Sequence, residues 1–216
     1  VSDWSRGIPR LIDYPTSVSE RATVDGIGNI LSSTDQLGST TSYGYDVMGR
    51  LTRIAYPVGD TRAWSDTTRE FVMVNVAEYG LPAGHWRQTV RTGDGQTSTF
   101  YDAQWHPVLA ITEDTALSSS KSFVVKRYDP MGREVFSSYP VGSLPGNQGL
   151  MEGVTTQYDA LGRPIRVNQD SEIGVLTTST NYLSGFQTMV TNPRGFKTTT
   201  SYQLFDAPST DAPVRI

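Results

Sequence analysis

A six-residue motif, Tyr-Asp-x-x-Gly-Arg, occurs three times in this chain. Its copies are Tyr45-Asp46-Val47-Met48-Gly49-Arg50, Tyr128-Asp129-Pro130-Met131-Gly132-Arg133 and Tyr158-Asp159-Ala160-Leu161-Gly162-Arg163. Recurrence of one short motif is the signature of a repeat architecture, in which each unit buries its apolar surface against its neighbours. The sequence therefore predicts a repeat array, and both fold and function have to be inferred from the repeated unit.

The motif has the residues of a three-residue hairpin loop built on a type I turn. The Asp carboxylate can accept hydrogen bonds from the backbone N–H groups of the turn, and Gly suits the corner where φ is positive. Pro130 supports this interpretation, because the second position of a type I turn has the φ that a proline ring imposes. Such a loop ends in a G1 bulge. Each copy is therefore expected at the tip of an antiparallel hairpin.

This turn geometry also predicts cross-strand neighbours. Asp46 should lie opposite Arg50, Tyr45 opposite Leu51 and Tyr43 opposite Arg53. The facing Asp and Arg would form an ion pair worth a few tenths of a kcal/mol up to about 1 if exposed. The later copies place different residues opposite the tyrosine, so the sequence does not assign the buried face. The residues expected to have a structural role in the motif are Tyr45, Asp46, Gly49, Arg50, Tyr101, Asp102, Tyr128, Asp129, Gly132, Arg133, Tyr158, Asp159, Gly162 and Arg163.

Partial copies extend the array. Val24–Asn29 keeps Asp and Gly, whereas Tyr101-Asp102 is followed by Trp105 where Gly is expected. That loop must adopt another turn or strain the backbone. A second element, an Asx-x-x-Gly turn feeding a Thr-rich strand that ends in Tyr, spans residues 35–43 and 192–202. Thr and Tyr favour strands, so hairpin is expected to follow hairpin.

These patterns predict an all-β fold of consecutive antiparallel β-hairpins. No stretch shows sustained helical periodicity, so helix should be scarce. We expect one continuous repeat domain. Its parts are an irregular lead-in with short strands (1–23), repeat hairpins (24–57), an insertion (58–91) with a strand at residues 69–76 and a loop at residues 79–86, and further repeat hairpins (92–216).

Composition excludes several classes of protein. The 216 residues carry a net charge of −4, with only three lysines, so there is no basic stripe to follow the phosphates of a nucleic acid. No apolar run is long enough to span a bilayer. The absence of cysteine excludes disulfides, thiol nucleophiles and zinc–thiolate sites. Because the chain begins at Val1 without an initiator Met, we expect it to be an excerpt of a longer polypeptide.

Catalytic, metal and cofactor sites are not expected. His85 and His106 are the only histidines, and neither has further ligands at short spacing. No Gly-x-Ser-x-Gly elbow is present, and most aspartates stand at turn-starting positions. The alternative to a purely structural role is glycan binding, in which Trp86 and Trp105 would stack on sugar rings. For the repeat tyrosines, core or cross-strand packing is the favoured interpretation.

The tandem motif, alternating with Asx-x-x-Gly-x-Thr-Thr-x-Tyr, resembles the YD repeats of bacterial Rhs proteins, which also occur in wall-associated proteins, Tc toxin C subunits and animal teneurins. The resemblance implies that the β-hairpins are stacked into an extended, curved sheet, which spirals into a hollow shell around a C-terminal toxin or effector. It also implies a secreted or cell-surface protein whose partners are the rest of its own polypeptide and the enclosed effector.

Such shells often end in a self-cleaving Asp-Pro-x-Gly-Leu element. Asp129-Pro130 and Asn192-Pro193 resemble its start, but both lie inside repeats without the Leu, so an ordinary turn is expected at each. We therefore expect a non-enzymatic structural segment, with carbohydrate binding as the alternative. Excised hairpin stacks present unpaired strand edges, which favours self-association.

Overall fold

The computed structural model describes residues 1–59, 61, 63–205 and 208–216. This part of the chain is all-β: it contains 18 strands and two short 3₁₀ turns, and no α-helix. The all-β prediction and the predicted scarcity of helix are confirmed.

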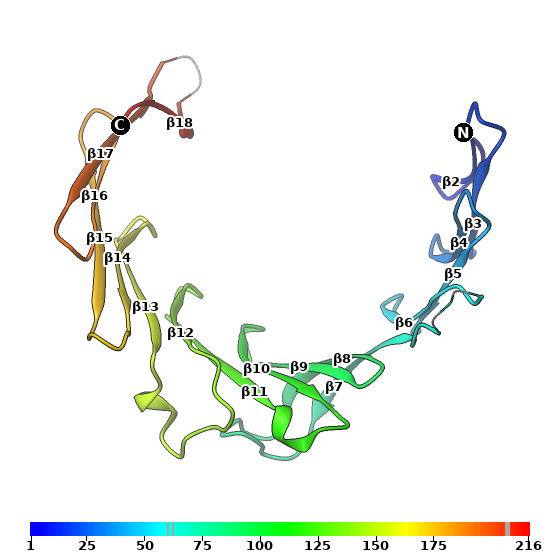
Figure 1. The fold of residues 1–216 in the computed structure, drawn as a ribbon, viewed down its shortest axis with the longest axis horizontal. Helices are drawn as coiled ribbons and strands as arrows, with labels where there is room; N and C mark the ends of the chain where they lie inside the picture. The colour runs from blue at the N-terminus through cyan, green and yellow to red at the C-terminus, as the bar shows by residue number, and fades with distance from the viewer. Residues whose placement is uncertain (60, 62, 206–207) are drawn as a thin grey trace. The chain divides into compact units, whose positions relative to one another are not determined.

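The first of two compact units comprises Val1–Tyr101 and Ala110–Lys121. Each strand in it pairs antiparallel with the next one in sequence, and Figure 1 shows β2 to β6 following one another along the blue-to-cyan part of the ribbon. Its strands are β1 (Ser2–Ser5), β2 (Ile8–Asp13), β3 (Ser19–Val24), β4 (Ile30–Thr34), β5 (Thr40–Tyr45), β6 (Leu51–Ala55), β7 (Thr67–Val74), β8 (His85–Thr92), β9 (Gly95–Tyr101) and the larger part of β10 (Pro107–Asp114), followed by the 3₁₀ turn Ser118–Ser120.

The second unit comprises Asp102–Leu109 and Ser122–Ile216. Its strands also pair antiparallel in sequence order. They are β11 (Ser122–Tyr128), β12 (Glu134–Ser138), β13 (Gly153–Tyr158), β14 (Pro164–Gln169), β15 (Leu176–Leu183), β16 (Gln187–Thr191), β17 (Lys197–Gln203) and β18 (Ser209–Arg215), with a 3₁₀ turn at Gln148–Leu150. The division into four parts that the sequence suggested (1–23, 24–57, 58–91 and 92–216) stays a prediction.

Hydroxyl side chains stabilise many of the strand pairs. Thr34 and Thr40, which lie opposite each other on β4 and β5, join their hydroxyl oxygens at 2.8 Å. Thr23 and Ser32 do the same at 2.6 Å across β3 and β4. Thr-rich strands suit a half-exposed sheet, because the branched side chain fits the pleat and its hydroxyl finds a cross-strand partner.

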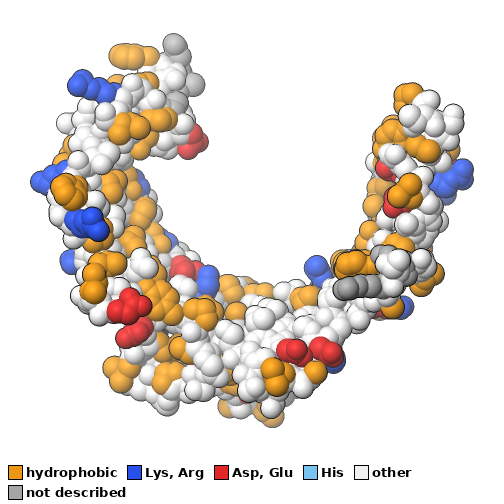
Figure 2. All heavy atoms as spheres, viewed as in Figure 1, with side chains coloured by type: hydrophobic (Ala, Val, Ile, Leu, Met, Phe, Trp, Pro, Cys, Tyr) orange, Lys and Arg blue, Asp and Glu red, His pale blue; other side chains and the backbone are white. Residues whose placement is uncertain are grey.

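The buried apolar core is small. In the first unit it consists of Val74, Phe100 and Ile111, and in the second of Leu109, Phe123, Val125, Phe136 and Met151. Many other apolar side chains are exposed, and Figure 2 shows them in small groups separated by polar surface. Backbone ladders and contacts between neighbouring hairpins must therefore carry much of the stability.

The predicted register is confirmed next to the turns and wrong further from them. Tyr45 lies opposite Leu51. Tyr43, however, lies opposite Ile54, and Arg53 faces Gly44. The register shifts between Gly44 and Tyr45, since the extra residue of a bulge moves every later pair along by one.

Candidate functional site

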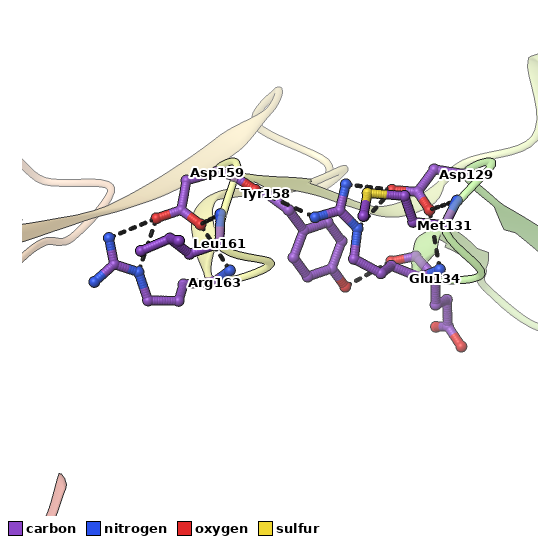
Figure 3. Close-up of polar contacts among 8 residues, drawn as sticks. Asp129, Met131, Glu134, Tyr158, Asp159, Leu161 and Arg163 are labelled. Carbon is purple, nitrogen blue, oxygen red and sulfur yellow. Dashed lines mark hydrogen bonds and ion pairs between the residues drawn. The ribbon is translucent and has the colours of Figure 1, made fainter.

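The turn that each full motif forms is the most repeated polar structure in the chain. In the second copy the N–H of Gly132 donates to the Asp129 carbonyl at 2.9 Å, and the N–H of Asp129 donates to the Arg133 carbonyl at 3.0 Å. One carboxylate oxygen of Asp129 accepts from the N–H groups of Met131 and Arg133 at 2.9 and 3.0 Å (Figure 3). The turns at Asp46 and Asp159 repeat this pattern. The sequence placed these turns correctly.

The second carboxylate oxygen binds the arginine of the motif. Nε of the arginine donates to Oδ2 at 2.7 Å in the Asp46–Arg50 pair, 2.7 Å in Asp129–Arg133 and 2.8 Å in Asp159–Arg163. The hydrogen bond from the Arg133 side chain, with those from the backbone, holds the pKa of Asp129 below its ordinary value. In Asp46 and Asp159 the backbone N–H of the arginine makes a leading contribution to a lowered pKa.

The arginine also contacts the next repeat. The Arg133 guanidinium lies 4.8 Å from the centre of the Tyr158 ring, and its Nη1 donates to the Asp159 carbonyl at 3.2 Å. In return the Tyr158 hydroxyl donates to the carbonyl of Glu134, the residue after Arg133, at 2.8 Å (Figure 3). These two hairpins are thus joined by contacts that run both ways: Arg133 reaches forward to Tyr158 and Asp159, and Tyr158 donates back to Glu134. We call this paired contact the Arg–Tyr ladder.

The same tyrosine hydrogen bond recurs at other junctions. Tyr45 donates to Ile30 at 2.9 Å and Tyr128 donates to Pro107 at 3.2 Å. Tyr182 donates to Pro164 at 3.1 Å and lies under the Arg163 guanidinium at 4.0 Å. The accepting carbonyl always belongs to the residue after the arginine position of the preceding repeat. Sequence reasoning missed Tyr182, because the turn that follows it lacks the Asp and Arg of the motif.

The copy at Asp102 keeps the turn by straining its backbone. Trp105 occupies the glycine position with φ +68°, and its N–H donates to the Asp102 carbonyl at 3.1 Å. Of the two alternatives left by the sequence, strain is therefore the correct one. His106 takes the place of arginine: Nδ1 lies 2.9 Å from Asp102 Oδ2, and the ring stacks on Tyr128 with centroids 4.5 Å apart. Burial would raise the pKa of Asp102, but hydrogen bonds from His106 and Gln104 lower it.

Turns of the same length that lack the full motif use the same side-chain capping. Asp25 and Asp35 accept hydrogen bonds from backbone N–H groups of their turns, as the partial copies predicted. Asn192 does so through its amide oxygen, at 3.0 Å from the N–H groups of Arg194 and Phe196. A related turn starting at Ser171 was not recognised from the sequence. Its signal is the glycine three residues later, Gly174, whose φ is +103°.

The two tryptophans proposed for glycan stacking belong to different units. Trp86 lies on β8, whereas the sequence assigned Tyr79–Trp86 to a loop; that assignment is wrong at His85 and Trp86, which start the strand. Trp86 is half-buried and stacks on Phe71, with ring centres 5.0 Å apart and planes 12° apart. Trp105 is 54% exposed at its turn tip. The role of both residues in sugar binding stays a prediction.

His85, the second histidine, is buried and held on both ring nitrogens. Nδ1 lies 2.8 Å from the Pro82 carbonyl oxygen and Nε2 lies 3.2 Å from Glu78 Oε1. Across the described residues, no three His, Cys, Asp or Glu side chains gather where a metal ion could be held.

No helix in this part of the chain is long and apolar enough to cross a membrane.

Comparison with known proteins yields one family and one fold. The family model described as RHS Repeat matches residues 24–61. A crystal structure of TcdB2-TccC3-Cdc42 is similar with a TM-score of 0.57 and 18% identity, over 87% of this chain and 10% of that one. A Photorhabdus luminescens Tc holotoxin pore gives a TM-score of 0.55 and 19% identity, over 85% of this chain and 9% of that one. A crystal structure of TcdB2-TccC3 without its hypervariable C-terminal region gives 0.54 and 16%, over 90% and 10%.

These likenesses establish the fold of the chain. This chain spans about a tenth of the length of the solved chains that it resembles. No curated protein matches the sequence.

Proposed function

We propose that this chain, of which residues 24–61 match the RHS Repeat model, is a non-enzymatic wall segment of a β-shell. In its parent polypeptide the shell would encapsulate or present a C-terminal toxin or effector. The observation that carries this proposal is the Arg–Tyr ladder, in which the polar residues of the motif are engaged in joining one hairpin to the next.

The environment of the motif aspartates supports a structural rather than a chemical role. A catalytic carboxylate needs an oxygen that can reach a substrate. In Asp129 one oxygen accepts two backbone N–H groups and the other accepts the Arg133 guanidinium. A lowered pKa also keeps the group ionised, which suits an ion pair and not a general acid.

The same proposal covers partners and location. We propose that neighbouring repeats of its own polypeptide, and the domain they surround, are the main partners of this chain. The name of one similar structure places TccC3 in a Tc holotoxin pore, and by analogy we propose a secreted or cell-surface location for this chain. One continuous repeat domain, built on the motif residues, is part of this proposal.

A protease-access experiment on the parent polypeptide tests encapsulation. The variant combines Arg133→Ala with Arg163→Ala, which removes the guanidinium from two successive junctions; Arg194→Ala is the matched control, since Arg194 lies at the exposed tip of the Asn192 turn. We expect trypsin to cleave the C-terminal domain faster in the double variant, by about thirtyfold if each of the two junctions loses roughly 1 kcal/mol. Equal cleavage of that domain in wild type and double variant would contradict encapsulation.

A further inference from the structure

One junction between hairpins of the second unit has a histidine where others have an arginine. At three of the described junctions a guanidinium lies over an aromatic ring of the next repeat, 4.0 to 5.2 Å from its centre. At the Asp102 turn, His106 stands in the arginine position, and its imidazole stacks on Tyr128 with planes 16° apart. Histidine ordinarily changes charge between about pH 5 and 8, whereas arginine stays charged. Of these four described contacts, only the one at His106 can therefore change charge near neutral pH.

The imidazole of His106 closes its own turn as well as contacting the next hairpin. Its Nδ1 lies 2.9 Å from Asp102 Oδ2, while Asp102 Oδ1 accepts from the N–H groups of Gln104 and His106 at 2.9 and 2.8 Å. The side chains of His106 and Asp102 are only 25% and 28% exposed, so water screens their attraction incompletely. Protonation of the imidazole thus adds an ion pair with Asp102 and places a cation over the Tyr128 ring.

The other ring nitrogen of His106 lies against the turn of the next hairpin. A Cβ added at Gly132 would lie 2.9 Å from His106 Nε2, so the imidazole fills the space where a side chain would otherwise stand. His106 therefore contacts the neighbouring hairpin at both Tyr128 and Gly132. A change in its charge acts on the junction as a whole.

The charged groups of the hairpin that packs against His106 are already paired. Lys126 Nζ lies 2.8 Å from Glu134 Oε2, and Arg133 Nη2 lies 2.7 Å from Asp129 Oδ2. Burial raises the pKa of the Tyr128 hydroxyl, so the stacked ring stays uncharged through neutral pH. The charge of this junction between about pH 5 and 8 is therefore set by the imidazole.

The turn that His106 closes is also a strained one. Trp105 has φ +68° at the position that Gly132 and Gly162 occupy in full copies of the motif, and a side chain in this left-handed region carries a steric cost. Hydrogen bonds to Asp102 hold the strained backbone in place, and His106 in turn holds the Asp102 carboxylate. A weaker His106–Asp102 pair thus acts on a turn that has little stability in reserve.

We propose that the contact of His106 with Asp102 and Tyr128 is a pH-sensitive joint, closed when the imidazole is protonated and loosened when it is neutral. Burial would raise the pKa of Asp102, but hydrogen bonds from His106 and Gln104 lower it, so this carboxylate is ionised from about pH 5 upwards. The closed joint pairs that carboxylate with an imidazolium. Its extra stability is therefore present at acid pH and is lost as the pH rises past neutrality.

The joint goes beyond the wall function, because it assigns a response to pH to one place in an otherwise permanently charged row of contacts. It needs no residue outside the second unit. It can therefore be tested without the enclosed domain of the parent polypeptide.

Amide hydrogen exchange of the whole 216-residue chain, measured by NMR at about pH 5.5 and about pH 8, tests the joint. The reporting amides are those of Trp105 and His106, which donate to the carbonyl and the carboxylate of Asp102. The amides of Gly162 and Arg163, which make the same bonds to Asp159, are the internal control. After correction for the intrinsic pH dependence of exchange, the protection of the first pair relative to the second should fall by about tenfold at the higher pH, since an ion pair and a cation–π contact weaken together.

Two substitutions separate the charge of the imidazole from its shape. His106→Arg restores the arginine of the full motif, so its relative protection should stay constant within about twofold between the two pH values. His106→Gln keeps a hydrogen-bond donor without a charge, so its relative protection should match that of the wild type at the higher pH under both conditions. Circular dichroism shows whether each variant is folded.

The proposal is overturned if relative protection in the wild type is the same at both pH values, or if its fall persists in folded His106→Arg. The wild-type comparison of the two turns decides the matter by itself should a variant not fold. Protease access in the parent polypeptide is a separate measurement, so failure of the joint and failure of the wall function remain distinguishable.

Discussion

At the scale of single residues, the motif separates two tasks between neighbouring side chains. Asp129 closes its own turn through backbone N–H groups, while Tyr158 reaches back to the hairpin before it. Arg133 takes part in both. Its Nε donates to Asp129, while its Nη1 donates to the Asp159 carbonyl and the face of the guanidinium lies over the Tyr158 ring. Replacing each residue should therefore have a distinct effect.

Removing one hydroxyl tests the ladder directly. Tyr158→Phe deletes the hydrogen bond to the Glu134 carbonyl and leaves the ring under Arg133, so the free energy of unfolding should fall by about 1 kcal/mol. Urea denaturation followed by circular dichroism measures the change. Tyr14→Phe, outside the ladder, is the control and should be neutral. An equal effect of both substitutions would mean that the ladder hydrogen bond contributes nothing specific.

The lowered pKa of Asp129 predicts a pH dependence with a definite sign. A carboxyl whose pKa is lower in the folded than in the unfolded state stabilises the fold above its unfolded pKa of about 3.9, and this stability is lost as pH falls through the folded pKa. Asp129→Asn removes the titration but keeps an acceptor oxygen, as Asn192 shows. The urea midpoint should therefore fall less steeply with acid below pH 4 in Asp129→Asn than in the wild type. Parallel curves would refute this expectation.

At the scale of hairpins, close backbone approach matters as much as the turns. Gly153, the first residue of β13, lies opposite Ser138 on β12. A Cβ added at Gly153 would overlap the Ser137 carbonyl and lie 2.7 Å from the Ser138 Cα. These are backbone atoms, so no flexible side chain can move aside.

Gly153→Ala should therefore destabilise the chain by about 1 to 3 kcal/mol through overpacking. Gly26→Ala is the matched control, because a Cβ there meets no atom within 4 Å and φ is not in the left-handed region. Urea midpoints compare the two variants. If Gly26→Ala lowered the urea midpoint as much as Gly153→Ala does, the destabilisation would come from the general effect of replacing glycine and not from the close backbone approach at Gly153.

The hairpins show which features a sequence can predict here. The turns were predictable, since Asp and Gly three residues apart encode their own local geometry. The ladder was not, because Tyr158 and Glu134 meet only through the pairing of different hairpins. The pairing of Tyr43 was missed for a related reason: the bulge beside Tyr45 shifts every later pair by one residue. Strain at Trp105 was one of two predicted alternatives, and only the structure could decide between them.

At the scale of the whole molecule, stability is spread over many small contacts. Within the described residues, the buried apolar side chains all fall between residues 74 and 151, so hairpins outside this stretch depend on ladders and cross-strand pairs. A sheet of this kind tends to pair with strands of other chains, since a strand at its edge presents unpaired backbone N–H and C=O groups. Among the described residues of the second unit, β18 pairs with β17 on one of its edges.

We therefore expect the isolated chain to self-associate as its concentration rises, and sedimentation velocity should show dimers or larger species. Val214→Lys, on exposed β18, should lower the weight-average mass at a given concentration, because a charge on a strand edge opposes further pairing. Val47→Lys, at an exposed turn tip, is the control. A monomer across the whole concentration range would contradict the expectation.

The tyrosine hydrogen bonds that join the repeats have a direction, because each tyrosine donates to a carbonyl that precedes it in the chain. A ribosome makes the acceptor before the donor. Every new hairpin can therefore settle on one that has already left the exit tunnel, with only a short loop to close. Synthesis from N to C terminus is then also an order of assembly, and a nascent chain that stalls partway would already be folded up to its last complete repeat.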